Sequence, residues 1–306
     1  MKYFIITIDT EGDNLWTYKE GDNITTQNAS FLRHFQDLCN KYGFIPVWLT
    51  NYEMVMCDEY VEFVKDYICG GKCEVGIHVH AWNNPPYFDL ARKYDGNPYL
   101  IEYPMEIMEQ KFVTTLNLIK ERIGVVPKSH RSGRWAMNDN YFNLLEKHGI
   151  EVDCSYTPYI TWQNSPGATI SGGSDYSHVS PYIQMIGNVI EVPMSIRKLP
   201  ILSNIKSVKQ FCKRVINGNK VWLRPSTNTL EEMLSLVDII DKDSNCNYLE
   251  FMMHSSEFMP GGSPYFKNSE SIKQLYNNIE SLFRYIKKLG YNGISLYDYA
   301  KNTEKQ

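Results

Sequence analysis

The sequence predicts an α/β protein with an incomplete or distorted (β/α)7–8 barrel and long loops on its catalytic face. Short apolar runs alternate with longer amphipathic stretches along the 306 residues, and this alternation favours a parallel sheet wrapped by helices. Several runs are apolar almost throughout, as strands covered on both faces are. About seven or eight such units suit a chain of this size, so we expect residues 1–306 to form a single domain.

Each predicted strand is a short apolar run that ends in polar or turn-forming residues. The strands are expected at residues 3–8, 46–49, 74–79, 128–131, 152–155, 189–192, 248–253 and 293–296. In a β/α barrel the carboxyl ends of the strands meet on one face, where the loops build the site. Polar side chains that follow these runs are therefore the first candidates for function.

The predicted helices are the amphipathic stretches between the strands. They are expected at residues 27–42, 59–68, 105–123, 139–148, 230–241 and 269–289. Gly43, Gly124 and Gly149 follow three of them, where a helix end favours glycine. Residues 81–104 and 156–188 break the alternation and are rich in Pro, Gly, Asn and aromatic residues, so we expect long loops that shape a substrate groove.

Composition and charge argue against several classes of protein. Hydrophobic residues make up 43% and charged residues 22%, as in a globular protein with a sizeable core. The net charge of −4, without long runs of one sign, argues against nucleic-acid binding. No apolar stretch approaches ~18 residues, so we expect no membrane span. The apolar N-terminus is too short and too soon acidic for a signal peptide, and seven cysteines without a CxxC pair indicate reduced thiols in a cytoplasmic protein.

Acidic and histidine side chains follow the first and third predicted strands. If the first strand stays extended, Asp9, Glu11 and Asp13 point the same way, and converging carboxylates repel unless a cation or a proton lies among them. His78 and His80 are likewise spaced to place both rings on one side. Two histidines and a carboxylate are a familiar catalytic metal set with positions left open for water. The alternative is a solvated acidic turn beside a hydrogen-bonded strand end.

Three further strand ends supply candidates. Arg131 follows the fourth strand, where an arginine can keep a carboxylate ionised through a bidentate bond, whereas Arg134 is interpreted as an ordinary structural or surface residue. Asp153 lies at the end of the fifth strand and His254 at the end of the seventh. A strand-end histidine with an aspartate from another strand is an arrangement typical of a general acid.

In this order the motifs resemble the polysaccharide deacetylase superfamily, carbohydrate esterase family 4 with the chitooligosaccharide-deacetylase homology domain. The resemblance rests on five blocks at strand ends: Thr7-Ile8-Asp9-Thr10-Glu11-Gly12-Asp13, Glu74-Val75-Gly76-Ile77-His78-Val79-His80-Ala81-Trp82, Arg131-Ser132-Gly133-Arg134, Asp153-Cys154-Ser155 and Met252-Met253-His254-Ser255. No block is specific by itself, whereas five in the family's order span most of the chain.

Two blocks depart from the family pattern. The family's adjacent acidic pair is replaced here by Asp9 and Thr10, which moves the implied metal ligand to Glu11 or Asp13. The family's second histidine lies four positions after the first, where this chain has Trp82. Either His80 takes that place or the site holds no metal.

The resemblance implies a metal-dependent hydrolase that removes an N-acyl (acetyl) group from an amino sugar of a polysaccharide or glycan precursor. The implied ligands of a divalent metal (zinc, or else nickel or cobalt) are Glu11, His78 and His80, with Asp13 as the alternative. Asp9, kept ionised by Arg131, would take the proton of the attacking water. His254, supported by Asp153, would protonate the departing amine.

The implied partner is a carbohydrate or amino-sugar substrate, and the histidine block looks like that of a subgroup linked with cell-surface polysaccharides. The residues expected at the sugar are Trp82, Trp135, Tyr156 and Trp162. Two alternatives stay open: a metal-free hydrolase of another non-peptide carbon–nitrogen bond on the same fold, and a catalytically inactive carbohydrate-binding relative.

Overall fold

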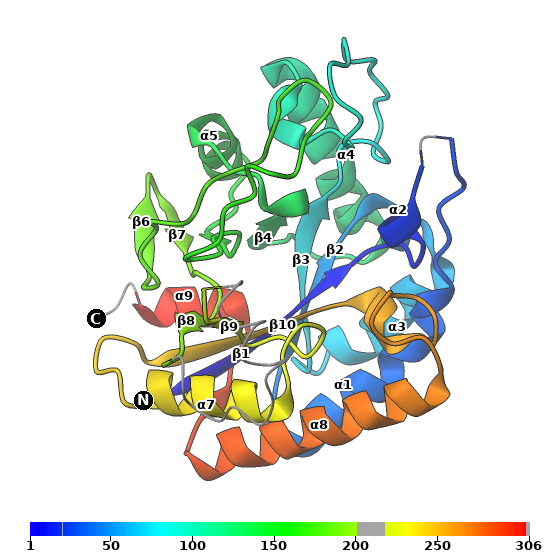
Figure 1. The fold of residues 1–306 in the computed structure, drawn as a ribbon. Coiled ribbons are helices and arrows are strands. Elements are labelled where there is room, and N and C mark those ends of the chain that lie inside the picture. Colours follow the sequence, from blue (N-terminus) through cyan, green and yellow to red (C-terminus); the bar gives the residue numbers. More distant parts are fainter. Residues whose placement is uncertain (20, 201–217, 304–306) are drawn as a thin grey trace.

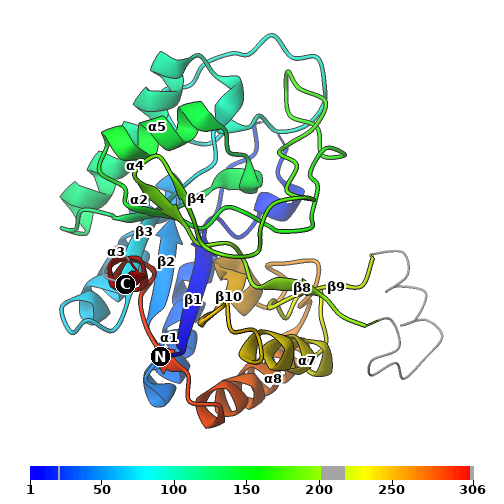
Figure 2. The same ribbon diagram turned by 90° about the vertical axis from the view of Figure 1, so that its left-hand side faces the viewer.

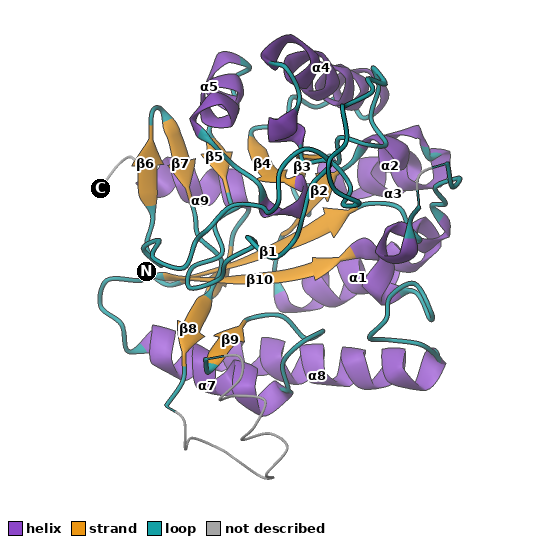
Figure 3. Ribbon diagram, turned by 45° about the horizontal axis from the view of Figure 1, so that its top comes forward, coloured by secondary structure: helices purple, strands orange, loops and turns teal. Residues whose placement is uncertain are grey.

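The centre of the protein, in a computed structural model that describes residues 1–19, 21–200 and 218–303, is a curled and open sheet. Its described strands follow the order β10-β1-β2-β3-β4-β5-β7-β6, with β11 beside β1. They are β1 (Tyr3–Thr10), β2 (Pro46–Thr50), β3 (Glu74–Val79), β4 (Ser129–Ser132), β5 (Val152–Asp153), β6 (Gln184–Ile186), β7 (Val189–Glu191), β10 (Tyr248–His254) and β11 (Asn292–Gly293). Figure 3 shows the sheet curving from β10 round to β6. The predicted incomplete barrel is confirmed.

Every pair of neighbours from β10 to β7 is parallel, and the edge pair β6–β7 is antiparallel. The first seven predicted strands agree with the observed ones to within two residues at each end. The eighth, predicted at 293–296, is wrong at its end: β11 stops at Gly293, and Leu296 begins a helix.

Helices cover the outer face of the sheet, where α7 and α8 pack side by side along β1 and β10 (Figure 1), whereas α9 packs in the inner-face cluster that contains Ile5 and Val47. They are α1 (Leu32–Tyr42), α2 (Tyr52–Met56), α3 (Asp58–Ile68), α4 (Met105–Arg122), α5 (Asp139–Lys147), α7 (Leu230–Asp241), α8 (Ser269–Lys288) and α9 (Leu296–Thr303). All six predicted helices are present, and that at 27–42 begins as the 3-10 turn η2 (Gln27–Phe31). Among the described residues, no helix has the length and apolar character needed to cross a membrane.

The two faces of the sheet bury different sets of apolar side chains, because successive residues of a strand point to opposite faces. On β1, Phe4 and Ile6 point outward and pack with the helices, in the larger core. Ile5 points inward and packs with Val47 and Leu49 of β2. Which face a polar strand-end residue reaches therefore depends on whether its position is odd or even within its strand.

The antiparallel pair of β8 (Ile196–Lys198) and β9 (Lys220–Trp222) covers the outer edge of β10 (Figure 2). The backbone N–H of Met252 donates to the carbonyl of Leu223 at 3.2 Å, and that of Glu250 to the Ser195 hydroxyl at 2.8 Å. These bonds satisfy backbone groups of β10 that a closed barrel would pair with another strand. They also bring the segment after β9 next to the end of β10.

Candidate active site

A cavity of about 500 Å³ opens where β1, β3 and β10 end. Most of the candidates from the sequence lie in its wall. The lining includes Asp9, Glu11, His78, His80, His254, Trp82, Trp135, Trp162, Arg134 and Arg224. In-register pairing explains part of this convergence, since Asp9 is paired with His254 and neighbours in register point to the same face.

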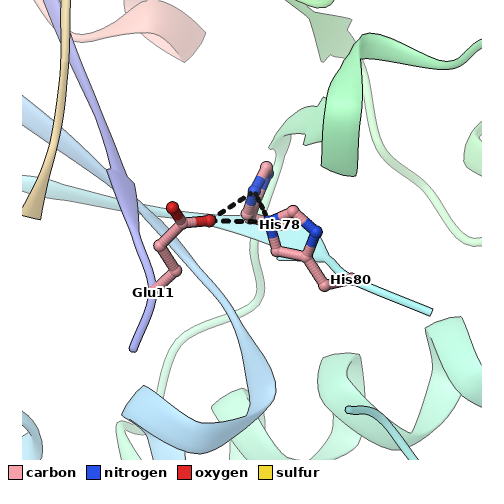
Figure 4. Close-up of side chains that lie close together, drawn as sticks. All are labelled: Glu11, His78 and His80. Atoms are coloured by element: carbon pink, nitrogen blue, oxygen red, sulfur yellow. Dashed lines mark hydrogen bonds and ion pairs between the residues drawn. The ribbon is translucent and has the colours of Figure 1, made fainter. Parts of the chain in front are cut away.

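Glu11, His78 and His80 form the tightest group of side chains in the cavity (Figure 4). The Nε2 atoms of the two histidines are 3.1 Å apart. The Glu11 Oε2 atom lies 2.6 Å from Nε2 of His80 and 3.5 Å from Nε2 of His78. All three side chains are buried. A nitrogen from each ring and one carboxylate oxygen thus converge on a single point.

Hydrogen bonding shows which atoms of this group can serve as ligands. Nδ1 of His78 is 2.8 Å from the Arg131 carbonyl, which can only accept, so Nδ1 carries the proton and a neutral His78 presents its Nε2 lone pair to the cavity. Nε2 of His80 faces the same point, and a proton or a cation has to lie between the two nitrogens. These donors fit a divalent metal such as zinc. Nδ1 of His80 is buried without a hydrogen-bond partner among the described residues. In most metal-binding histidines, by contrast, the ring nitrogen that does not bind the metal donates a hydrogen bond.

Negative charge at this end of the cavity is concentrated on two carboxylates, those of Glu11 and Asp9. Burial alone would raise the pKa of Glu11, but His80, His254 and hydrogen bonds from the histidines hold it well below its usual range. Two ionised carboxylates, Asp9 and Glu11, therefore face one small volume. Their mutual repulsion is relieved by positive charge placed between or behind them.

Asp9 forms the expected ion pair with Arg131. Nη1 of Arg131 donates to the carboxylate at 2.6 Å, and both side chains are buried. Burial would raise the pKa of Asp9, but Arg131, His78 and His254 more than offset it, and the net shift is downward. Asp9 is therefore ionised at neutral pH and has an oxygen facing His254, 3.7 Å from its Nε2.

Arg131 is shared with a second carboxylate that sequence reasoning missed. Its Nη2 donates to Glu250 at 2.7 Å and to Thr7 at 2.5 Å, while Nε donates to the Cys154 carbonyl at 3.1 Å. Burial raises the pKa of Glu250 to about 8, although Arg131 opposes the shift. Glu250 lies inside an apolar run on β10, where the signal available in the sequence is a single charged residue in an otherwise buried strand.

His254 has partners different from those predicted. Nε2 faces the cavity, 3.8 Å from Glu11, and Nδ1 lies 3.0 Å from Nη2 of Arg224 and 3.5 Å from Glu257. The Glu257 side chain also accepts from the backbone N–H of His254 at 2.8 Å, as part of a capping box of the 3-10 turn η5 (Ser255–Phe258). Burial would raise the pKa of Glu257, but Arg224 and His254 lower it to about 2.

The predicted support of His254 by Asp153 is wrong. The Asp153 carboxylate instead bonds Nδ1 of His130 at 2.6 Å and the Ser155 hydroxyl at 2.9 Å. Asp153 and His130 are in register on β5 and β4, and both point to the outer face of the sheet, toward Tyr141 of α5. His254 points inward, so a layer of backbone separates the two groups.

Asp13 is not brought to the group of Glu11, His78 and His80 either. Strand β1 ends at Thr10, so the extended alternation that would align Asp13 with Asp9 does not continue. The Asp13 carboxylate accepts from the Thr25 hydroxyl and, at 3.3 Å, from the backbone N–H of Asn28. It holds the loop that follows β1, and Glu11 is the acidic member of the group.

Of the aromatic residues predicted at the sugar, Trp82, Trp135 and Trp162 line the cavity. The rings of Trp135 and Trp162 are parallel, with centroids 6.2 Å apart, and the Trp82 ring packs on that of His80 at 4.3 Å. Tyr156 does not line the cavity. Its ring packs among other aromatic side chains of the core, 4.8 Å from that of Tyr176.

Several lining residues were not predicted because they come from segments without a strand-end motif. Trp16 belongs to the turn η1 (Leu15–Thr17), and its ring meets that of His254 at 4.9 Å. Arg224 follows β9, and Tyr265 follows η5. Glu257, which contacts His254 without lining the cavity, did carry a signal, the three-residue spacing from His254 that a capping box requires.

The fold has counterparts among solved structures, whereas the sequence matches no protein-family model and no curated protein. A candidate polysaccharide deacetylase from Mycobacterium smegmatis aligns over 100% of this chain and 91% of its own, with a TM-score of 0.53 and 12% identity. A 4-alpha-glucanotransferase from Thermococcus litoralis aligns over 99% of this chain and 38% of its own, with a TM-score of 0.51 and 12% identity.

The chain therefore has the fold of the polysaccharide deacetylases, as the order of its motifs predicted. The glucanotransferase, whose name describes a different reaction, has a similar fold. Because one fold hosts different reactions, the function has to be argued from the side chains in the cavity.

Proposed function

We propose that the protein is a metal-dependent hydrolase that removes an N-acyl group, such as acetyl, from an amino sugar. The observation that carries this proposal is the convergence of Glu11, His78 and His80 beside the Asp9–Arg131 pair, with His254 across the same cavity. This set contains the ligands, the base and the acid that amide hydrolysis requires.

Glu11, His78 and His80 would hold a divalent cation, and zinc suits two imidazole nitrogens and one carboxylate oxygen best. Nickel and cobalt accept the same ligands. Such a cation would polarise the acyl carbonyl and make a water molecule more acidic. All three residues line the cavity, so a cation held by them would be accessible from it.

The remaining roles belong to protein side chains. Asp9, kept ionised by Arg131, accepts the proton of the attacking water. An amine is a poor leaving group, so its nitrogen has to be protonated as the carbon–nitrogen bond breaks. Nε2 of His254 faces the cavity and is positioned to give that proton when both ring nitrogens are protonated; Nδ1–H then faces Glu257, which orients the ring, and Nδ1 no longer accepts from Arg224.

The shape of the cavity favours a sugar as substrate. Its walls carry the rings of Trp16, Trp82 and Trp162, and a volume of about 500 Å³ suits a small ligand. Flat aromatic faces with a few directed polar groups are suited to bind a sugar ring, whose carbon faces are apolar and whose hydroxyls are polar.

The test combines a metal assay with an acetate-release assay. Protein purified without chelator is analysed for zinc, nickel and cobalt, then incubated with N-acetylated amino sugars and oligosaccharides before and after removal of the metal. We expect one ion per chain and acetate release that chelator abolishes and the returning ion restores. The variant His148→Gln serves as a control, because His148 pairs with Glu109 outside the cavity.

Two outcomes would replace the proposal with a rival. Hydrolysis that persists after complete metal removal would favour a metal-free hydrolase of another carbon–nitrogen bond. Sugar binding without hydrolysis of any substrate by metal-loaded protein would favour a carbohydrate-binding relative without activity.

A further inference from the structure

The charged side chains around the cavity are matched in pairs, with one exception among the described residues. Asp9 is paired with Arg131, and Glu257 with Arg224 at 3.5 Å. Glu11 is matched by the two histidines of the metal group. Arg134 lines the same cavity, but no carboxylate of residues 1–19, 21–200 or 218–303 lies within 4 Å of its guanidinium.

The Arg134 guanidinium is held rigidly by neutral groups. It lies 4.0 Å from the centre of the Tyr99 ring and donates to the Asn97 carbonyl, to the Ser165 hydroxyl at 2.8 Å and to the Pro166 carbonyl at 3.0 Å. A guanidinium has five N–H donors, so two remain beyond these three bonds. Burial lowers the pKa of Arg134, with Tyr99 and Glu102 opposing the shift. Its charge is thus partly desolvated, and Glu102 attracts it at longer range without forming a direct ion pair.

The backbone around Arg134 is also constrained. Arg134 and Trp135 adopt φ values of 56° and 62°, a left-handed region that side chains disfavour. Gly133 before them lies so close to His80 that an added Cβ would come within 2.9 Å of Nδ1. The segment is therefore pressed against the metal group, and its arginine is fixed relative to the reacting centre.

We propose that Arg134 binds an anionic group of the substrate, a carboxylate or a phosphate, in the corner of the cavity that it forms with Asn97 and Ser165. The inference rests on the proposed function in that it names an acidic amino sugar as the substrate class of the same cavity. A guanidinium with free donors and low hydration favours carboxylate and phosphate over neutral hydroxyls. Arg134 is thereby a specificity residue rather than the ordinary arginine that its sequence context indicated.

Equilibrium binding measured by calorimetry tests the inference without relying on turnover. The probes are N-acetylglucosamine, N-acetylglucosamine 6-phosphate and N-acetylmuramic acid, which share the amide but differ in charge. We expect wild-type protein to bind at least one acidic probe about tenfold or more tighter than the neutral one, a preference that added salt weakens. Arg134→Gln should remove most of that preference, and Arg134→Lys should retain part of it. Arg284→Gln removes an equal charge from α8, outside the cavity, and should keep the preference.

Each outcome of the binding measurement either supports the inference or overturns it. A preference for only one acidic probe supports the inference and names the carboxylate or the phosphate as its source. Equal binding of all three probes by wild-type protein would overturn it, as would a preference that survives in Arg134→Gln. An equal loss of affinity for all three probes in both Arg134 variants would show that Arg134 only holds the loops together, and would also overturn the inference. Acidic preference without acetate release would defeat the proposed function alone.

Discussion

Two buried clusters of histidine and carboxylate lie at neighbouring strand ends, and they differ in what surrounds them. The inner cluster of Glu11, His78 and His80 faces a cavity. The outer cluster joins His130 to Asp153 and is closed, with both side chains fully buried. Residue types and strand-end positions are alike, so neither property alone separates a reactive group from a structural one.

The difference lies in how completely each cluster is satisfied. Both ring nitrogens of His130 have partners, Asp153 at 2.6 Å and the Tyr141 hydroxyl at 2.8 Å. In the inner cluster, two ring nitrogens and an ionised carboxylate converge. The protein supplies too few hydrogen-bond donors to satisfy their lone pairs. A closed, paired cluster stabilises the fold, whereas an open and under-compensated one is suited to bind a ligand. Substitutions in and around the two clusters test this distinction.

The largest effect is expected from losing a metal ligand. His80→Ala should abolish stoichiometric binding of zinc, nickel or cobalt and lower kcat by about three orders of magnitude or more, since a catalytic cation contributes several kcal/mol. Metal content by atomic emission and acetate release measure the two effects. A matched change in the outer cluster, His130→Gln, should leave the metal in place. Full metal occupancy in His80→Ala would show that the inner cluster is not a metal site.

The second effect concerns the base. Asp9→Asn keeps the size of the side chain and the contact with Arg131 but removes the proton acceptor. We expect kcat to fall by about two to four orders of magnitude while the metal content stays close to that of wild type. Parallel loss of metal and activity would instead identify Asp9 as a ligand.

The third effect separates the acid from a structural histidine. His254→Ala should lower kcat on an N-acetyl sugar by about a hundredfold or more and that on an aryl acetate far less, because an aryloxide leaves without protonation. Glu257→Gln changes the orienting partner of His254. It should also lower kcat more on the N-acetyl sugar than on the aryl acetate, but by a smaller factor. Equal losses on both substrates would remove His254 from the acid role.

These roles show what could be predicted from the sequence. Apolar runs predicted the order of the barrel strands, because buried parallel strands have a clear composition. Strand-end polar residues predicted Asp9, Glu11, His78, His80 and His254 in the cavity. The partner of His254 was mistaken because register is invisible in one sequence, and a shift of one residue moves Asp153 to the other face. Arg224 could not be predicted, since only the packing of β8 and β9 on β10 brings it to His254.

A smaller effect is expected in a second cavity of about 300 Å³, which shares Trp82 and Asn97 with the first. Tyr87 lines it and is 74% exposed, so its ring is free to contact a neighbouring sugar of a longer substrate. Tyr87→Ala should raise KM for an oligosaccharide by about three- to tenfold, the worth of one aromatic contact, with little change for a monosaccharide. Tyr94→Ala is the matched control, because Tyr94 is exposed in the same loop outside that cavity. Equal effects of the two variants would contradict a sugar contact at Tyr87.

The smallest effect on catalysis is expected where the resemblance placed a catalytic residue. Asp153→Ala breaks a buried pair with His130, and removing one partner of such a pair lowers the free energy of unfolding by about 3–5 kcal/mol. Because Asp153 lies on the outer face, the folded fraction should keep its metal and a kcat within about threefold of wild type. Urea unfolding followed by circular dichroism gives the stability, and acetate release corrected for the folded fraction gives kcat. If Asp153→Ala unfolds at the assay temperature, Asp153→Asn retains a hydrogen bond to His130 and allows the same comparison. A stable variant with metal bound and a hundredfold lower kcat would show that Asp153 acts on the reaction, and the distinction between the two clusters would fail.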